Sequence, residues 1–260
     1  MRNILAIVER ELRAYFVSPV AYVVLAIFVF LSGVFFQTIT TQLVQAAQAI
    51  AFQSQQFGGA VPAIDVPGEI SRQYFGTLSV ILLFMLPMIT MGLFSEEKKR
   101  GTIELLLTAP LTDFEVVMGK FLSAVAFYTI MLVTTFVPMS VLFMYSDPAW
   151  GPLATGYLGI FLYGVGLLAL GLFVSTLTEN QIVSGVLGFG MILLLWMVDV
   201  IGQGATETTR AVLTYLSVLS HLGDFMNGVL ASSNVIFYLS LVTLGLFLTY
   251  RSIDSLRWRG

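Results

Sequence analysis

The chain carries its densest run of charge in Ser95-Glu96-Glu97-Lys98-Lys99-Arg100-Gly101-Thr102-Ile103-Glu104-Leu105-Leu106-Leu107-Thr108-Ala109-Pro110-Leu111-Thr112-Asp113-Phe114-Glu115, between two long apolar segments. Glu96 and Arg100 are four residues apart, a spacing at which an ion pair forms along a helix. Gly101 is expected to end that helix, because glycine adopts the left-handed conformation that follows many helices. The run from Thr102 to Ala109 then predicts a short helix, which Pro110 stops.

Two capping boxes mark the starts of later helices. Thr112 and Glu115 have the spacing at which a threonine hydroxyl and a glutamate three residues on cap each other's backbone N–H groups. Thr178 to Gln181 repeats the pattern. The first box predicts a helix from about Thr112. The second predicts a short turn between the fourth and fifth apolar segments, which are therefore expected to be antiparallel.

The composition is that of a membrane protein. Of the 260 residues, 57% are hydrophobic and only 10% are charged, and the mean hydropathy is +0.91. Soluble domains carry about 25% charged residues. The composition therefore indicates a membrane protein with several spans, for which we predict an all-α fold. The formal net charge of −3 gives no reason to expect a nucleic acid as a partner.

Several kinds of chemistry are excluded or unsupported. The sequence contains no cysteine, so it has no disulfide, thiolate metal site or cysteine nucleophile. His221 is the single histidine, which makes a multi-histidine metal site within one chain impossible. No cofactor is expected. No cleavable signal peptide is expected either, because charges interrupt the first 16 residues.

Six apolar segments are long enough, or nearly so, to cross a bilayer, which takes roughly 20 helical residues. Pro87 and Pro138 lie inside two of them and are expected to bend them. The fourth and fifth are rich in glycine, which allows close helix packing either within one chain or across a dimer. The predicted spans are residues 19–39, 74–94, 113–145, 153–177, 181–201 and 235–250.

The remaining segments are shorter or polar. Residues 1–17 form an amphipathic pattern that predicts a helix lying flat at the membrane surface, with a packed helix of a small soluble subdomain as the alternative. Residues 95–112 form the charged loop, and residues 42–72 an outer loop for which a helix is predicted at residues 42–56. Residues 202–234 hold a short apolar stretch between polar turns, which predicts a re-entrant segment or, alternatively, a surface loop.

The basic residues predict the orientation, because lysine and arginine are concentrated on the cytoplasmic side. With the N-terminus inside, ten of the twelve are cytoplasmic and only Arg72 and Arg210 are external. Six spans place both termini and the charged loop in the cytoplasm. Lys120 is expected to extend its amine to the headgroups. The ten internal residues are Arg2, Arg10, Arg13, Lys98, Lys99, Arg100, Lys120, Arg251, Arg257 and Arg259.

No residues for catalysis are apparent. Of the lysines, only Lys120 follows a glycine, and a phosphate-binding loop needs a second glycine at position 114, which is Phe114. Any ATP hydrolysis is therefore expected on another chain, and this chain is not expected to be an enzyme. Asp199 either lies at the outer interface or serves an ion or substrate path. Nothing places a nucleophile near His221 and Asp224.

Three motifs resemble the ABC-2 family of ABC transporter permeases, most of all its gliding-motility-associated and copper-enzyme-maturation group. The first resembles the first cytoplasmic loop of these permeases and is followed by Gly119-Lys120. The second resembles their N-terminal elbow helix, and the third the segment before the last span. The motifs are Glu97-x-x-Arg100-Gly101-Thr102-x-Glu104-x-Leu106-Leu107-x-x-Pro110, Glu9-Arg10-Glu11-Leu12-Arg13-x-Tyr15-Phe16-x-Ser18-Pro19 and Ser220-His221-x-x-x-Phe225-x-x-Gly228.

The resemblance implies a type V (ABC-2) exporter-like permease in the inner membrane. It has six transmembrane helices, a cytoplasmic coupling helix and short re-entrant external helices. It further implies two copies of a separate cytoplasmic ABC ATPase and pairing with a second copy or a related permease. Residues implied in coupling are Glu97, Arg100, Gly101, Thr102, Glu104, Leu106, Leu107 and Pro110 in the loop, and Arg10 and Arg13 in the elbow; His221 and Asp224 are candidates for a role in the external segment.

Two other functions remain open from the residues themselves. A self-sufficient secondary transporter or channel would need ionisable groups at mid-membrane, of which Asp199 is the one candidate. A membrane anchor for periplasmic proteins would use the large outer loops. No cluster of side chains in the spans identifies a substrate.

Overall fold

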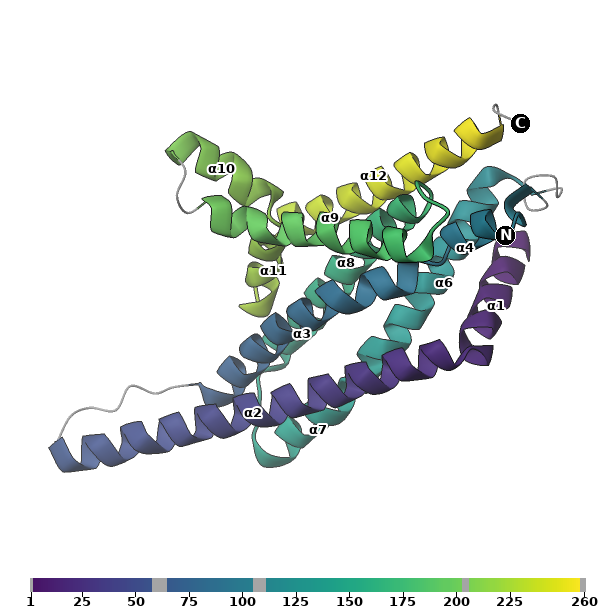
Figure 1. Cartoon of the computed structure of the whole chain (residues 1–260). Helices are drawn as coiled ribbons and strands as arrows, with labels where there is room; N and C mark the ends of the chain where they lie inside the picture. The colour runs from purple at the N-terminus through teal and green to yellow at the C-terminus, as the bar shows by residue number, and fades with distance from the viewer. Residues whose placement is uncertain (1, 58–64, 105–110, 203–205, 258–260) are drawn as a thin grey trace.

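A computed structural model describes residues 2–57, 65–104, 111–202 and 206–257, and these residues form helices without any strand (Figure 1). The first five helices are α1 (Arg2–Val17), α2 (Pro19–Phe57), α3 (Val66–Thr90), α4 (Ser95–Lys99) and α6 (Asp113–Thr134). The others are α7 (Phe136–Tyr145), α8 (Trp150–Ser175), α9 (Gln181–Gly202), α10 (Glu207–Leu216), α11 (Val218–Met226) and α12 (Ser232–Arg257).

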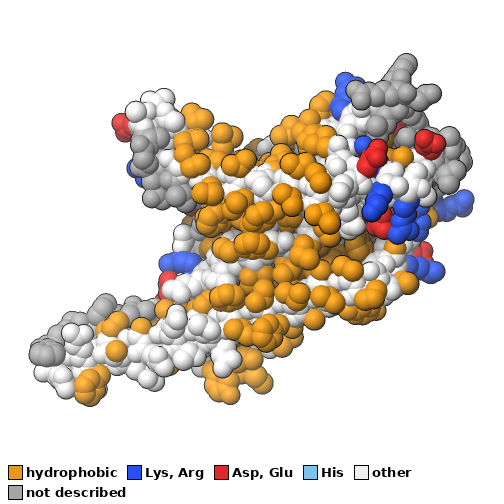
Figure 2. All heavy atoms as spheres, in the orientation of Figure 1, with side chains coloured by type: hydrophobic (Ala, Val, Ile, Leu, Met, Phe, Trp, Pro, Cys, Tyr) orange, Lys and Arg blue, Asp and Glu red, His pale blue; other side chains and the backbone are white. Residues whose placement is uncertain are grey.

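Six helical stretches are long and apolar enough to cross a membrane, which confirms the predicted class of a multi-pass all-α membrane protein. Apolar side chains cover the middle of the molecule, and charged side chains gather at the end where α4 and both termini lie (Figures 1 and 2). An even number of crossings returns the chain to the side on which it began. The six stretches are Pro19–Gln56, Val66–Lys99, Asp113–Tyr145, Trp150–Ser175, Gln181–Val198 and Ser232–Ser255.

Helix α8 forms the centre of the bundle and packs against α3, α6, α9, α11 and α12. Its glycines make this packing possible. A Cβ atom on Gly164 would lie 2.2 Å from the Tyr128 ring, and one on Gly171 would lie 2.3 Å from the Thr90 hydroxyl oxygen. The hydroxyl of Tyr128 donates a 2.5 Å hydrogen bond to the carbonyl oxygen of Ile160, one turn before Gly164. The glycines of the fourth span therefore pack helices within one chain.

Helix α2 is longer than the predicted span of residues 19–39. It has 39 residues, or roughly 58 Å at 1.5 Å per residue, whereas a bilayer's hydrocarbon core is about 30 Å thick. Its C-terminal half extends past the bundle (Figure 1). Alanine and glutamine dominate residues 42–57, and both favour helix although they are too polar to indicate a span.

The predicted kink of the third span is a one-residue interruption of the helix. Helix α6 ends at Thr134, Thr135 is a turn residue, and α7 starts at Phe136. Pro138 has no N–H group for the carbonyl of residue 134, and its ring clashes with that carbonyl. At the same point, the Thr135 hydroxyl donates a hydrogen bond to the carbonyl oxygen of Leu132 at 2.6 Å.

Between the fifth and sixth spans lie two short helices, α10 and α11. The residues alone indicated one short apolar stretch there, and the resemblance implied short external helices. Ser217 separates them, and its hydroxyl caps α11 by accepting from the Ser220 N–H at 3.2 Å. Helix α11 packs into the bundle, because a Cβ atom on Gly159 of α8 would lie 2.5 Å from the fully buried Phe225. Gly228, with a φ of 82°, ends α11.

The cap of the fifth span differs from the prediction. Helix α9 begins at Gln181, and the side-chain oxygen of Asn180 accepts the N–H of Ile182 at 2.9 Å. The Thr178 hydroxyl accepts only from the Asn180 N–H, at 3.2 Å. Asparagine is as good an N-cap residue as threonine. Asn180, which directly precedes Gln181, is therefore the N-cap of α9.

Candidate docking groove between the N-terminal helix and the charged loop

The charged loop folds locally as its sequence predicts. Arg100 pairs with Glu96 at 2.5 Å along α4. Gly101 adopts a φ of 68°, and the N–H groups of Gly101 and Thr102 donate to the carbonyl oxygens of Lys98 and Glu97 at 3.1 and 3.0 Å. These bonds form a Schellman motif, which closes the C-terminal end of α4. Ile103 and Glu104 are helical again, at the start of the predicted coupling helix.

A buried lysine joins this loop to the N-terminal helix. The Nζ atom of Lys120 on α6 lies 2.9 Å from Oε1 of Glu97 on α4 and 3.1 Å from Oε1 of Glu11 on α1. Arg10 extends the network, with contacts of 2.6 Å to Glu11 and 3.3 Å to Glu97. We call these four residues the ion cluster. Its two cations and two anions balance, which is the condition for stable burial of charge.

The ion cluster corrects the prediction that Lys120 extends to the lipid headgroups. Its side chain is only 1% exposed, and its amine also lies 5.2 Å from the centre of the Phe94 ring. The long lysine side chain turns inward because two carboxylates from other helices replace water around the amine. Glu97 had been predicted as a coupling residue, whereas its contact with Lys120 had not been predicted.

Charge in the cluster shifts the protonation of its members. Burial acts to raise the pKa of Glu11, but the charge of Lys120 and the hydrogen bond from Arg10 outweigh it, and the pKa of Glu11 lies below its usual value. The hydrogen bond to Glu11 raises the pKa of Arg10. At neutral pH both residues are therefore charged, as the cluster requires.

Close packing holds α1 against α6 beside the cluster. A Cβ atom on Gly119 would lie 2.6 Å from Cγ2 of Ile7, so only glycine admits α1 at this distance. The Tyr15 ring stacks on Phe127 of α6 with centroids 5.2 Å apart, and the Tyr15 hydroxyl donates to the carbonyl oxygen of Ile89 on α3. The N-terminal helix is therefore packed against two spans, α3 and α6. Gly119 allows the close contact with Ile7, and Lys120 supplies the positive charge that pairs with Glu11.

The loop also contacts the centre of the bundle. The Lys98 amine donates to the carbonyl oxygen of Thr176, at the C-terminal end of α8. A cation is favourable there, because the last carbonyls of a helix carry partial negative charge. The hydroxyl of Thr176 in turn donates to Ser252 of α12 at 2.8 Å. Side chains of α4 therefore contact α1, α6 and the end of α8.

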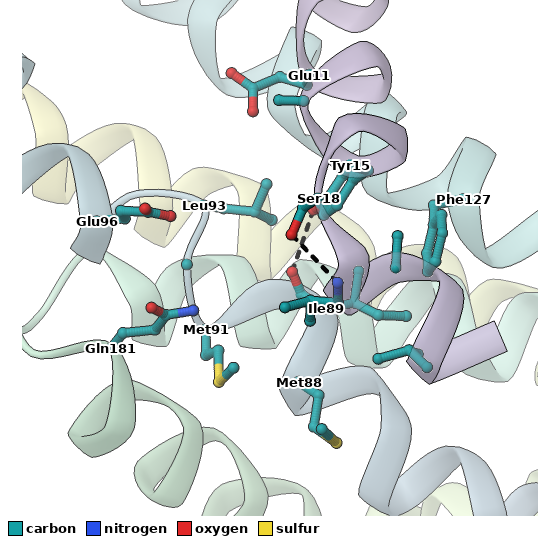
Figure 3. A pocket seen from close by; sticks show the side chains of 15 residues that line it. Glu11, Tyr15, Ser18, Met88, Ile89, Met91, Leu93, Glu96, Phe127 and Gln181 are labelled. Carbon is teal, nitrogen blue, oxygen red and sulfur yellow. Dashed lines mark hydrogen bonds between the residues drawn. The ribbon is translucent and has the colours of Figure 1, made fainter. Parts of the chain in front are cut away.

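A groove of about 910 Å³ opens between α1 and the loop. Arg10, Arg100 and Lys120 contribute three positive charges to its lining, and three glutamates, at positions 11, 96 and 97, balance them. A second cavity of about 290 Å³ adjoins it, as both are lined by Glu11, Ser18 and Glu96. Figure 3 shows this cavity under the corner between α1 and α2, with Tyr15, Met88, Ile89 and Phe127 forming apolar walls.

The structure gathers some of the predicted coupling residues and separates others. Arg10, Glu97, Arg100 and Thr102 line the groove. Arg13 points elsewhere and pairs with Glu9 at 2.6 Å on the exposed side of α1. Leu106, Leu107 and Pro110 lie outside the described residues. Glu11 and Lys120 were not predicted as members of the site. A lysine within an apolar span requires a nearby anion, and this was the signal for both.

The candidates outside the loop lie apart from this groove. Nδ1 of His221 donates to the carbonyl oxygen of Ser217 at 2.9 Å, and the ring stacks on Phe237 with centroids 3.9 Å apart. Asp224 accepts from the Asn234 amide at 2.8 Å. Both residues thereby brace α11 against α12, and any further role remains a prediction. The backbone of Asp199 belongs to α9, but its side chain lies outside the described residues.

Six candidate spans and a charged loop joined by ion pairs to an amphipathic N-terminal helix fit the membrane subunit of a transporter. The chain belongs to the ABC-2 transporter family: the family described as ABC-2 family transporter protein matches residues 5–253. It is therefore a membrane subunit of a transporter, in a family that generally works with an ABC ATPase and as a dimer. The likeness to one particular permease group within the family remains a prediction.

Two relatives share part of the chain. Both are named "Probable multidrug ABC transporter permease YbhR", one from Escherichia coli (strain K12) and one from Escherichia coli O157:H7. Each is 34% identical over 103 residues, which is 37% of this chain and 26% of the relative. The match therefore spans about a quarter of the relatives' length.

Proposed function

We propose that this chain is the permease subunit through which a separate cytoplasmic ABC ATPase drives export or mechanical work across the inner membrane. The permease itself hydrolyses no ATP, and it works with a second copy of itself or a related permease and two copies of the ATPase. The ATPase docks on the charged groove and on the coupling helix, and closure of the ATPase dimer shifts the loop.

The ion cluster is the observation that supports this proposal most strongly. Glu97 belongs to the loop, Glu11 to the N-terminal helix and Lys120 to a span, and the three are joined by contacts of 2.9 and 3.1 Å. Force applied to the loop would therefore act on three elements together. A loop that served only to set topology would need no such connection to a buried lysine.

The distribution of charge supports a cytoplasmic groove. Ten of the twelve basic residues fall on the side of the groove in the predicted topology. The chain also lacks a phosphate-binding loop of its own, since position 114 is Phe114 rather than glycine. A partner with a nucleotide site is therefore needed for any work driven by ATP.

Co-purification with a candidate ABC ATPase from the same genomic neighbourhood tests the proposal. Glu104→Lys, and Leu106→Asp combined with Leu107→Asp, should each weaken binding and reduce the stimulation of ATP hydrolysis by the permease. Glu69→Lys, the same charge reversal near the start of α3, is the matched control and should bind normally. Unchanged binding and stimulation in both loop variants would overturn the assignment of the coupling site.

The projecting part of α2 favours a second function, that of an anchor for periplasmic proteins. Residues 19–64 contain no charged side chain, and Phe52 on the projection is 63% exposed. A photo-crosslinking residue at position 52 should capture periplasmic proteins in cells. One at Phe30, which is 68% exposed but lies in the predicted span, should not. Equal capture from both positions would contradict this function.

Transport by a self-sufficient mechanism has a direct test. Purified permease in liposomes should move no cargo without its ATPase. Uptake or efflux driven by an ion gradient alone would favour a secondary transporter and a role for Asp199.

A further inference from the structure

An apolar groove of about 450 Å³ lies between α6 and α12, apart from the docking groove. Phe114, Val117 and Met118 form its α6 wall, and Leu246, Phe247 and Tyr250 form its α12 wall. Phe114 follows the charged loop directly, and Tyr250 precedes Arg251. The groove therefore lies near the end of the bundle that carries α4 and both termini.

The groove opens to the surroundings of the bundle. The Phe114 and Phe247 side chains on its two walls are 58% and 54% exposed. In the predicted topology α6 and α12 both cross the bilayer, so lipid chains surround them, and an apolar recess offers water no hydrogen-bonding partner. The chemistry of the walls therefore fits a hydrocarbon chain.

A cation lies against Phe247, one of the residues that line this groove. The guanidinium carbon of Arg251 lies 5.6 Å from the centre of the Phe247 ring, and the Arg251 side chain is 64% exposed. Asp254 approaches it at 3.7 Å. A guanidinium carries five N–H donors and binds phosphate oxygens in a bidentate manner. One distant carboxylate leaves most of these donors available to a further anion.

The sequence beyond the groove adds to the positive charge. Residues 251–259 contain three arginines, at 251, 257 and 259, against one aspartate, at 254. Basic residues that follow a span directly attract anionic lipid headgroups. The apolar walls thus suit a hydrocarbon chain, and the cation suits an anionic headgroup attached to that chain.

We propose that this groove binds an anionic glycerophospholipid, with an acyl chain between α6 and α12 and the phosphate at Arg251. The proposed topology places this lipid in the cytoplasmic leaflet. A zwitterionic lipid fills the groove equally well but carries no net charge to match Arg251. The preference for an anionic headgroup is therefore assigned to the arginine, and the retention of any lipid to the walls.

Native mass spectrometry of the detergent-purified chain tests both parts, using phosphatidylglycerol and phosphatidylcholine with identical acyl chains. The natural chain should retain phosphatidylglycerol preferentially. Arg251→Gln should reduce that preference about fivefold, the effect expected of one basic residue at an anionic surface. Arg72→Gln is the matched control, since Arg72 also pairs with a carboxylate three residues away, Glu69 at 3.1 Å; it should keep the preference.

A bulky residue tests the walls. Thr243 lines the groove and is exposed, so Thr243→Trp should fill it and lower the retention of both lipids while the chain still folds. Equal retention of the two lipids by the natural chain, or an Arg72→Gln effect as large as that of Arg251→Gln, would overturn the proposal. So would crosslinking between two copies through Thr243→Cys, because the groove would then be an interface. None of these measurements requires the ATPase, so they can fail while the proposed function stands.

Discussion

The amine of Lys120 lies 2.9 Å from the carboxylate of Glu97, and the lysine side chain is almost completely buried. The two residues are 23 positions apart and belong to different helices. Their contact, together with that to Glu11, joins the charged loop, the N-terminal helix and one span through ion pairs.

Removing the lysine should destabilise the protein strongly. Lys120→Met leaves Arg10 as the one cation of the cluster beside two carboxylates, so one negative charge is uncompensated in a partly buried site. Such a change typically costs about 3–5 kcal/mol. Thermal unfolding in detergent, followed by tryptophan fluorescence, measures the loss. Adding Glu97→Gln to Lys120→Met should restore part of the stability, because the uncompensated charge is gone. If the two losses simply add, the residues are not coupled in the folded protein.

Acid should weaken the same cluster. The pKa of Glu11 in the folded protein is lower than its usual 4.5, so its charged form stabilises the fold above that pH. That stabilisation is lost as the pH falls from 4.5 through the lowered pKa. The melting temperature of the natural chain should therefore exceed that of Glu11→Gln at pH 7, and the difference should shrink below pH 4.5. A difference that is constant across this range would contradict the assignment.

The contact between Gly119 on α6 and Ile7 on α1 should not accommodate an added methyl group. Gly119→Ala places a Cβ atom 2.6 Å from Ile7, and overpacking of this kind costs about 1–3 kcal/mol. Limited proteolysis after α1 should report its loosening. Gly76→Ala on α3 is the matched control: its Cβ atom would meet nothing within 4 Å, and alanine favours helix. Ile7→Ala combined with Gly119→Ala should regain protection, and a failure to do so would place the clash elsewhere.

The loop depends on one left-handed residue. Gly101 has a φ of 68° and no atom within 4 Å of an added Cβ, so Gly101→Ala strains the backbone alone, by about 1–2 kcal/mol. Gly101→Asn should cost less, because asparagine tolerates this conformation. Stimulation of the ATPase should fall in the order glycine, asparagine, alanine. Equal activity of the three would show that the Schellman turn does not position the coupling helix.

Local signals in the sequence predicted local structure well. The capping box at Thr112 and Glu115 is present, with the Thr112 N–H 3.1 Å from the Glu115 carboxylate. Gly101 ends α4, and Pro138 interrupts the third span where its missing N–H requires. In each case the partners lie within a few residues, so spacing alone determines the interaction. The six spans follow from hydropathy in the same way.

Interactions between distant segments were the ones missed. Lys120 was placed at the headgroups because its contacts with Glu11 join residues 109 positions apart, and no periodicity reports such a pair. Helix at residues 42–56 was predicted and is present, but its continuity with the first span was missed, because its glutamines suggest solvent. Glycines in the fourth span indicated close packing, but only the structure shows that their partners belong to the same chain.

The ion cluster also has a consequence for how this surface can evolve. Lys120 shares its charge between carboxylates on two separate elements, so no exchange of one pair of residues can reverse the polarity of the site. A neutral residue at position 120 becomes tolerable only when position 11 or position 97 loses its charge as well, because Arg10 still balances one carboxylate. Across descendants of this chain, a change at position 120 is therefore expected to accompany a change at position 11 or 97.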